Sequence, residues 1–280
     1  MFGDTYFVID AQYEYAYDFV DEYAIVVKYG NERKCGFINK KGKLVIDYEF
    51  DAARPFINGF AAVCEDGKWG FINEKGKYVI EPQYELVSDF GDNKLALIKK
   101  DGEWGIVDKD GDEIIKTRYD EMYSFAENGL AAVCEDGEWG FVNKKGKEVI
   151  DCGFDSVTSF SDNGLAAVCE DGKWGFVDRN GKWVIEPCYD YIEISADHYL
   201  SYMDEYKYEP GCAFLNDKAV VSKDGNNYIV DKKGNETKLV GIDFVEAVYA
   251  DYIVFSKDGM CGIMNMDGEI VVKAKYNYIG

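Results

Sequence analysis

The chain contains a single histidine, His198, and any Ser-His-Asp or Cys-His catalytic arrangement would have to use it. It lies in the segment Ala196-Asp197-His198-Tyr199, which holds no Gly-x-Ser-x-Gly nucleophile motif. A histidine in an exposed loop is the better interpretation. No catalytic residue is predicted at this place.

Acidic side chains are the most abundant reactive groups, with 53 Asp and Glu residues. A pair of them could serve glycoside hydrolysis. However, acids recur at equivalent places, such as Glu65-Asp66, Glu135-Asp136 and Glu170-Asp171. A catalytic acid is typically unique within an array, so recurrence favours turn formation and solvation. A hydrolase is therefore the least favoured function.

The sequence offers no convincing metal site. Asp108-Lys109-Asp110-Gly111-Asp112 resembles the start of a calcium loop, but Glu113 and Tyr119 stand where an EF-hand needs Gly and Glu. No Cys-x-x-Cys pair is present among the eight cysteines, so a zinc site is not expected. We predict neither a metal nor a cofactor, and interpret the Asp108 segment as an acidic hairpin turn.

Several of the cysteines occupy a repeat position that is expected to pack in the core. Cys64, Cys134 and Cys169 occupy one place in a repeat where another copy has Ile98. A position that accepts Cys or Ile favours apolar packing over a disulfide, because free Cys behaves as a small hydrophobe. We therefore expect the thiols to be reduced.

The formal net charge of −22 limits the classes of partner. Such a surface repels nucleic-acid phosphates and anionic lipids, whereas it suits a basic protein partner. No apolar run approaches the roughly 20 residues of a membrane span, so membrane insertion is not expected. The start of the chain shows no signal peptide, which would have a basic segment followed by an apolar one. Together with the expected reduced thiols, this predicts a cytoplasmic location.

The chain is built from a sequence repeat, which sets the positions of the acids and cysteines described above. Trp-Gly pairs recur every 35 residues, and weaker copies place Cys35-Gly36, Tyr228-Ile229 and Cys261-Gly262 at the same position, which makes seven. We predict that the pairs are structural anchors: Trp69 and Gly70, Trp104 and Gly105, Trp139 and Gly140, Trp174 and Gly175. The glycine would permit a bulge or a close backbone approach where the next unit packs.

Each copy is predicted to contain three strands joined by two tight turns, Asp-Gly and Lys-Gly. In one copy these are Leu130–Cys134, Asp136-Gly137, 139–143, Lys145-Gly146 and Glu148–Ile150. The linker spacing of Tyr84, Val87 and Phe90 predicts a 3₁₀-like turn or a bent strand between units.

One such meander cannot bury its own face, so the copies should stack with a continuous core. The predicted fold is all-β: seven antiparallel meander repeats of about 35 residues in a curved array, forming one domain over residues 1–280. Seven repeats suit a propeller-like ring. An extra third strand at about 6–13, where Ile9 matches Ile80 and Tyr13 matches Tyr84, suits an open solenoid instead.

With these residues laid out, the chain resembles the WG-repeat family of bacterial proteins. The pattern Gly-Leu-Ala-Ala-Val-x-x-x-Gly-Lys-Trp-Gly-Phe-x-x-x-x-Gly-Lys-x-Val-Ile-x-Pro-x-Tyr-Asp is met closely at residues 59–84 and 164–190. The resemblance implies a repeat module for interaction, alone or fused to other domains. It supplies no catalytic residues.

One stretch breaks the period. An insertion of 19 residues at about 193–211 lies between the fifth and sixth repeats. Insertions in repeat proteins often form the binding face, and tyrosines are favoured at interfaces. The candidate binding residues are His198, Tyr199, Tyr202, Asp204, Tyr206 and Tyr208. The alternative is a flap or short helix that covers the array.

We therefore predict a non-enzymatic module for protein–protein interaction or scaffolding. The alternative is a surface or extracellular module that binds glycans through the recurrent Trp and Tyr residues. Solvent exposure of the four Trp-Gly tryptophans separates these two hypotheses, because a glycan platform requires exposed rings.

Overall fold

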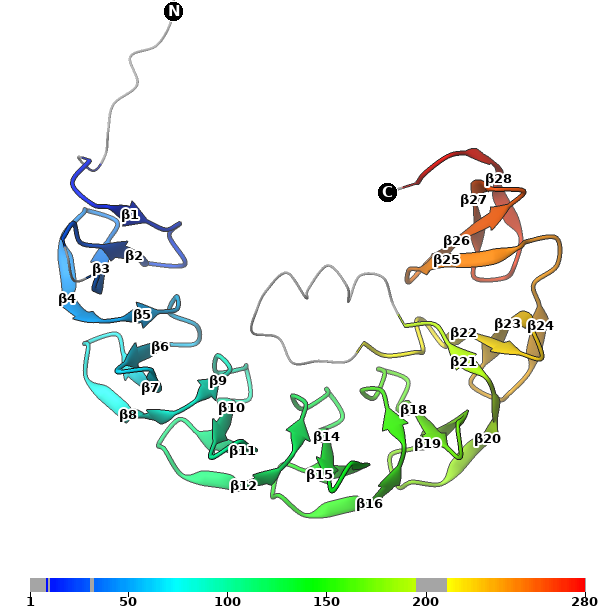
Figure 1. The fold of residues 1–280 in the computed structure, drawn as a ribbon, viewed down its shortest axis with the longest axis horizontal. Helices are drawn as coiled ribbons and strands as arrows, with labels where there is room; N and C mark the ends of the chain where they lie inside the picture. The colour runs from blue at the N-terminus through cyan, green and yellow to red at the C-terminus, as the bar shows by residue number, and fades with distance from the viewer. Residues whose placement is uncertain (1–8, 10, 31–32, 195–210, 280) are drawn as a thin grey trace, which may run out of the picture. The chain divides into compact units, whose positions relative to one another are not determined.

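The computed structural model describes residues 9, 11–30, 33–194 and 211–279. Among these residues no helix occurs, and the strands assemble into seven four-stranded antiparallel sheets, coloured in chain order in Figure 1. The predicted all-β fold of seven meander repeats is confirmed. The chain divides into two compact units, residues 1–118 and 119–280, which we describe separately.

The first unit holds three sheets, whose strands pair in chain order. The first sheet has β1 (Tyr15–Ala16), β2 (Tyr23–Val27), β3 (Cys35–Asn39) and β4 (Leu44–Phe50). The second has β5 (Ala52–Ala53), β6 (Phe60–Glu65), β7 (Lys68–Asn73) and β8 (Tyr78–Tyr84). The third has β9 (Leu86–Val87), β10 (Leu95–Lys100), β11 (Glu103–Asp108) and β12 (Glu113–Tyr119).

The second unit holds four sheets of the same order. The fourth has β13 (Glu121–Met122), β14 (Leu130–Glu135), β15 (Glu138–Asn143) and β16 (Glu148–Phe154). The fifth has β17 (Ser156–Val157), β18 (Leu165–Glu170), β19 (Lys173–Asp178) and β20 (Trp183–Tyr189). The sixth has β21 (Tyr191–Ile192), β22 (Lys218–Lys223), β23 (Asn226–Asp231) and β24 (Glu236–Lys238). The seventh has β25 (Phe244–Val248), β26 (Tyr252–Lys257), β27 (Met260–Asn265) and β28 (Ile270–Tyr276).

Each repeat thus has four strands rather than the predicted three. The linker supplies the additional strand: in the third sheet, β9 pairs Val87 with Ile98 and then leaves the sheet. Val87 and Phe90 are each 1% exposed, so this segment fills the space beneath the longer strands. It matches the bent-strand alternative, because a bend at Glu85 separates β8 from the two-residue strand β9, and Tyr84, Val87 and Phe90 are all buried.

The Asp-Gly pairs form tight hairpin turns with left-handed backbone at both central residues, as in Asp66 (φ 49°) and Gly67 (φ 74°). Such turns match the twist of the flanking strands. The second hairpin of each repeat is closed by an Asn or Asp side chain that accepts two backbone N–H bonds, from residues two and four positions later. This acceptor is present in all seven sheets: Asn39, Asn73, Asp108, Asn143, Asp178, Asp231 and Asn265.

The glycine of each Trp-Gly pair faces backbone at close range. A Cβ on Gly70 would lie 2.5 Å from the carbonyl oxygen of Ile80 and 2.6 Å from the nitrogen of Pro82. The strand pairing is irregular here, because the register shifts between Trp69 and Phe71. The close approach predicted for this glycine is present, but its partner is the third long strand of the same repeat, and not the next unit.

The core lies between successive sheets within each unit. Phe71, Ile80 and Tyr84 of the second sheet pack with Ala96 and Ile98 of the third. Successive side chains along a strand point to opposite faces, and the long strands are apolar on both faces, so a sheet can contribute to two such layers. Stacking of neighbours thereby buries what a single meander leaves exposed, as the repeat predicted.

The proposed N-terminal strand falls partly outside the described residues, which include neither 6–8 nor 10. Residues 9 and 11–13 are not in a strand. Ile9 nevertheless lies where a third-strand isoleucine would: it is 3.1 Å from a Cβ built on Gly42, as Ile46 is 3.3 Å from one built on Gly76. The segment therefore packs on the first sheet in the manner of a preceding repeat.

Candidate functional site

The insertion was the leading binding site from the sequence. Its candidate residues, His198, Tyr199, Tyr202, Asp204, Tyr206 and Tyr208, lie outside the described residues. The two ends of the insertion are well packed, since Ile192, Ala213 and Phe214 are 2%, 2% and 3% exposed. The backbone N–H of Glu193 also donates to the carbonyl of Val220. The insertion thus leaves and rejoins the sixth sheet at fixed points.

The Trp-Gly tryptophans are packed against the sheets. Trp104 and Trp139 are 5% and 9% exposed, and Trp69 and Trp174 are half-buried against the cores of their units. Other side chains cover their rings: Tyr123 stacks on Trp139 at 4.7 Å, and the Arg54 guanidinium lies 4.8 Å from the Trp69 ring centre. This packing is what a structural role of these residues requires, and the role itself stays a prediction. Two of the four rings are buried and two are half-buried, which disfavours a glycan platform made of all four.

The recurrent acids that follow the third long strand have a shared structural role. Five of these carboxylates accept a hydrogen bond from a backbone N–H in the hairpin between the first two long strands of the next sheet, as Asp51 does from Asp66 at 2.8 Å. The same bond occurs at Glu85, Asp155, Asp190 and Asp243. These acids hold the hairpins in place. The sequence analysis had named the acids of the hairpins themselves, such as Glu65-Asp66, and not these acceptors.

Lysines reinforce two of these acids across neighbouring sheets. Lys34 donates to Asp51 at 2.6 Å, and Lys173 pairs with Asp190. The hydrogen bonds from these lysines, with those from the hairpin N–H groups, hold the pKa values of both carboxyls below their usual range. The two acids are therefore firmly ionised, which suits a structural tie better than a proton donor.

Asp108, the first residue of the calcium-like segment, is engaged in the second hairpin of its repeat. Its Oδ1 accepts the N–H groups of Asp110 and Asp112 at 2.9 and 3.0 Å. The segment is an acidic turn equivalent to the Asn-closed turns of other repeats. Among the described residues, no group of three or more His, Cys, Asp or Glu side chains is arranged to hold a metal ion.

The thiols lie in protected positions. All eight cysteines are free, and Cys35, Cys64, Cys134 and Cys169 are buried. Burial raises the pKa of each of these four thiols, so the nucleophilic thiolate is disfavoured. In three repeats the cysteine is the cross-strand partner of the Trp-Gly tryptophan, as Cys64 is of Trp69. These cysteines are packing residues, as the sequence predicted.

Tyr189 is a buried titratable group that the sequence analysis did not single out. Its phenol is in a side chain only 1% exposed and donates to Glu236 Oε1 at 2.9 Å. Burial, followed by this bond to a carboxylate, raises the pKa of Tyr189. The phenol stays protonated and ties β20 to β24, so it links the fifth sheet to the sixth.

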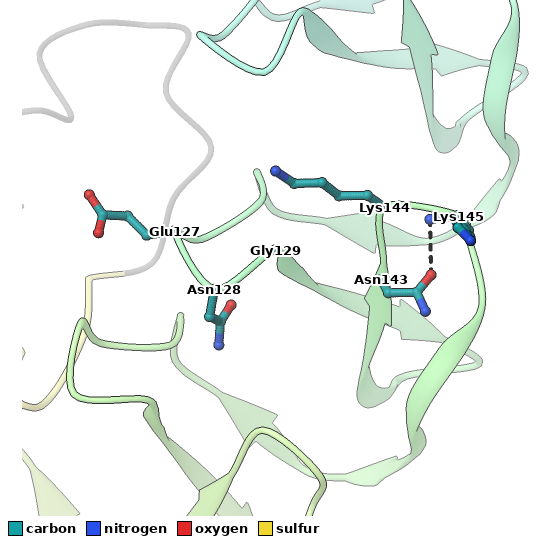
Figure 2. Close-up of a pocket in the computed structure, with 6 residues that line it drawn as sticks. All are labelled: Glu127, Asn128, Gly129, Asn143, Lys144 and Lys145. Atoms are coloured by element: carbon teal, nitrogen blue, oxygen red, sulfur yellow. Dashed lines mark hydrogen bonds between the residues drawn. The ribbon is translucent and has the colours of Figure 1, made fainter.

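One hollow lies beside the turns of the fourth sheet and has a volume of about 450 Å³. It is lined by Glu127, Asn128, Gly129, Asn143, Lys144 and Lys145. Asn143 Oδ1 accepts the N–H of Lys145 (Figure 2), and Asn128 Oδ1 accepts that of Leu130. The two amide oxygens are thus occupied in shaping turns. The hollow offers a charged contact surface and no converged acid–base pair.

A smaller hollow of about 250 Å³ lies where the first and second sheets meet. Tyr15 and Tyr17 form one side and are more than half exposed, while Arg33 lies 5.9 Å from the Tyr15 ring centre. Arg33 also pairs with Glu14 at 2.8 Å. Sequence reasoning missed these residues, although the alternation of Tyr13, Tyr15 and Tyr17 was a visible signal.

Exposed large apolar side chains gather at the first and last sheets. Of the fourteen in the described part of the chain, four lie in residues 15–29 and seven in residues 240–278: Tyr15, Tyr17, Phe19 and Tyr29, then Val240, Phe244, Tyr252, Ile270, Val271, Tyr276 and Tyr278. Val45 is a further one in the first sheet, and the sheets between the first and the last carry two, Val184 and Tyr191. Surfaces of this kind are typical of contact sites. The described residues contain no helix long and apolar enough to cross a membrane.

The repeat geometry agrees with a known family. The family described as WG containing repeat matches residues 7–31, 36–69, 69–104, 104–139, 139–174, 174–194 and 262–280. The chain belongs to this WG-repeat family. The longest unmatched stretch, residues 195–261, holds most of the insertion, β22 to β24 of the sixth sheet, and β25 and β26 of the seventh. In the sixth sheet, β24 has three residues where the last strand of each other sheet has seven.

Comparison with curated protein sequences finds no match. Among solved structures, the chain is similar to a crystal structure of the eukaryotic initiation factor, with 13% identity, a TM-score of 0.53, and coverage of 96% of this chain and 79% of that one. It is also similar to Kluyveromyces lactis Hsv2p, with 12% identity, a TM-score of 0.40, and coverage of 92% and 96%. At 13% identity the likeness to the first of these structures concerns the fold alone.

Proposed function

We propose that this WG-repeat protein is a non-enzymatic module for protein–protein interaction or scaffolding. The observation that carries the proposal is that its recurrent polar groups are engaged in hydrogen bonds that hold the turns of the sheets. The carboxylates of Asp51, Asp155 and Asp190 bind hairpin N–H groups, and the acceptor of each second hairpin closes its own turn. The buried thiols have raised pKa values. These carboxylates, turn acceptors and thiols stabilise the repeats, and the exposed surface of the repeats is what a protein partner would contact.

We further propose that a specific partner binds through the insertion, Glu193 to Gly211, and the rim beside it. Repeated copies present similar surfaces, whereas the insertion is unique and dense in tyrosine. Tyrosine supplies large contact area at low entropic cost. The insertion carries Asp197, Asp204, Glu205 and Glu209 against Lys207, so a basic partner would associate faster.

The test replaces residues 195–210 with a short Gly-Ser linker, which keeps the packed ends at Ile192 and Ala213. Partners captured from the native host by the parent chain are identified, purified and titrated against both proteins. Affinity should fall by about tenfold or more, because the anchors are removed. A second variant, Tyr202→Ala with Tyr206→Ala, keeps the length and charge of the insertion and should reproduce most of the loss.

The outcomes separate the alternatives. Equal affinity of parent and linker variant would place the site elsewhere on the array. Loss of the β-sheet circular dichroism signal in the linker variant would identify the insertion as a structural flap. Hydrolytic or transferase activity that copurifies with the parent chain and is abolished by a single carboxylate substitution would contradict the non-enzymatic assignment.

A further inference from the structure

The tryptophan of the Trp-Gly pair is replaced by a small residue in the first sheet. Cys35 pairs with Val27 across the first hairpin. In the fourth sheet, the equivalent pair is Trp139 with Cys134. Because a thiol is far smaller than an indole ring, the first sheet leaves at this place a volume that the fourth sheet fills.

Two neighbours enclose this ring in the fourth sheet. Tyr123, which directly follows the short strand β13, stacks on Trp139 with ring centroids 4.7 Å apart. Val157, on the short strand β17 of the next sheet, belongs to the same buried cluster as Trp139. The tryptophan therefore lies in a slot between the short strands of two successive sheets.

Tyr17 forms one wall of the same slot in the first sheet. Its backbone N–H donates to the carbonyl of Ile25, as that of Tyr123 donates to the carbonyl of Ala132. Each acceptor lies two residues before the cross-strand partner of the anchor position, so the two tyrosines are equivalent. Tyr17 has Cys35 in place of an anchor ring and is 60% exposed, whereas Tyr123 is half-buried.

A hollow of about 250 Å³ takes the place of the ring in the first sheet. It is lined by Tyr17, Cys35 and Ala53, among other residues. Ala53, on the short strand β5 of the second sheet, holds the place of Val157 and is the smaller side chain. Both sheets belong to the first compact unit, so the hollow lies within one unit of the chain.

Asp51 places a hydrogen-bond acceptor on the lining of the hollow. Its Oδ1 accepts a bond from Lys34, and its Oδ2 accepts one from the Asp66 N–H. Each oxygen of a carboxylate has two acceptor positions, so Asp51 can receive a further N–H donor. Tyr15 and Arg33 also line the hollow and add a second aromatic face and a cation. A largely apolar slot with one acceptor suits an indole, which is apolar apart from its single N–H.

We propose that this hollow binds a tryptophan side chain presented by a protein partner, with the indole stacked on Tyr17. The chain itself indicates the occupant, because the equivalent position in other repeats holds Trp69, Trp104, Trp139 and Trp174. An aromatic side chain in a fitted pocket is a common centre of a protein interface. The inference rests on the proposed function as an interaction module and adds a second site to it, whose residues lie outside the insertion.

The test titrates the peptide acetyl-Gly-Trp-Gly-amide into the isotope-labelled full chain and follows NMR chemical shifts. The tryptophan peptide should bind saturably, and acetyl-Gly-Ala-Gly-amide should not. Tyr17→Ala should weaken binding by about three- to tenfold, which is the effect of losing one aromatic pair. Tyr29→Ala is the matched control: Tyr29 is 66% exposed in the first hairpin of the same sheet, lies outside the lining of the hollow, and should leave binding unchanged.

Cys35→Trp tests the slot from within the chain. The substitution supplies the ring that four other repeats carry, so it should raise the midpoint of thermal unfolding and abolish binding of the tryptophan peptide. Cys35→Ala keeps the hollow open and should retain binding. Circular dichroism establishes that each variant is folded, and the comparison of Tyr17→Ala with Tyr29→Ala decides the question if Cys35→Trp does not fold.

Three results would each overturn the proposal: no saturable shifts with the tryptophan peptide, equal binding of the tryptophan and alanine peptides, or full binding by a folded Cys35→Trp variant. The linker variant of residues 195–210 should bind the tryptophan peptide as the parent does, and its failure to bind would place the site in the insertion instead. The peptide titration needs no native partner, so a failure of the insertion site and a failure of this hollow are distinguished. An enzymatic activity of the parent would refute the proposed function and leave the peptide result as it is.

Discussion

The ring of Tyr123 stacks on that of Trp139, with centroids 4.7 Å apart and an angle of 10° between the planes. Tyr123 follows the short strand β13, and Trp139 lies on β15, so the contact joins the linker to the repeat anchor of the fourth sheet. Trp139 is thereby 9% exposed and belongs to the cluster that also contains Leu130 and Phe160.

Replacing this tryptophan should destabilise the fold strongly. Trp139→Ala leaves a large cavity beside Tyr123, and we expect the free energy of unfolding to fall by about 3–5 kcal/mol. Urea denaturation followed by circular dichroism measures it. Tyr278→Ala, whose side chain is 80% exposed, is the control and should change the free energy of unfolding by less than about 0.5 kcal/mol. An equally small effect of Trp139→Ala would show that the ring is dispensable.

Gly140, beside this tryptophan, should tolerate no larger side chain. A Cβ at Gly140 would lie 2.6 Å from the carbonyl oxygen of Ile150 and 2.7 Å from the nitrogen of Cys152, both backbone atoms. Gly140→Ala should therefore lower the free energy of unfolding by about 1–3 kcal/mol through overpacking.

Gly153 provides the matched control on the paired strand β16. A Cβ at Gly153 meets no heavy atom within 4 Å, and Gly153 is not among the positive-φ glycines. Gly153→Ala should leave stability unchanged or raise it by about 0.4–1 kcal/mol, because it restricts the unfolded chain. A similar loss for both variants would mean that the close backbone approach at Gly140 does not limit the side chain.

The repeat was readable from the sequence because its turns and anchors are local signals. Asp136-Gly137 and Gly140 recur at fixed spacing, and each acts within one sheet. The additional strand was harder to see, since β13 has two residues and owes its strand geometry to pairing with β14. Two residues carry no measurable alternation, so only the partner strand reveals the element.

The contact surfaces were less predictable, because they depend on which faces the fold leaves uncovered. Tyr276 and Tyr84 occupy equivalent places in their repeats, yet one is 46% exposed and the other 2%. Nothing in the local sequence around Tyr276 distinguishes it. Exposure at this place depends on what packs against the sheet, which the local sequence of the repeat does not specify.

The ties between repeats should make stability depend on pH. The hydrogen bond from Lys34 and that from the Asp66 N–H lower the pKa of Asp51, and Lys173 and the Asp224 N–H do the same for Asp190. A carboxyl with a lowered folded-state pKa contributes stability above its unfolded pKa, which is near 3.8 for Asp. That contribution is lost as the pH falls through the lower, folded value.

We therefore expect Asp51→Asn with Asp190→Asn to flatten the acid limb of the stability curve below about pH 4. Denaturation at a series of pH values from neutral to acid measures this limb. Glu81→Gln, an exposed side chain on β8, is the control and should leave the curve as in the parent. A parallel displacement of the whole curve, with the acid slope retained, would mean that other carboxylates supply the pH dependence.

The eight cysteines should be reduced and unequal in reactivity. Alkylation of the denatured, non-reduced protein should modify eight thiols, and a stoichiometric disulfide would contradict both the free state and a reducing compartment.

In the native protein, Cys64, Cys134 and Cys169 are buried with raised pKa values, whereas Cys152 and Cys261 are partly exposed. Because the thiolate is the reacting species, we expect the buried thiols to react at least about tenfold more slowly. Timed alkylation read by peptide mass spectrometry distinguishes the two groups, and denaturant should equalise them. Equal native rates would show that the strands around the Trp-Gly anchors open freely, which the packing of Cys134 beside Trp139 does not allow.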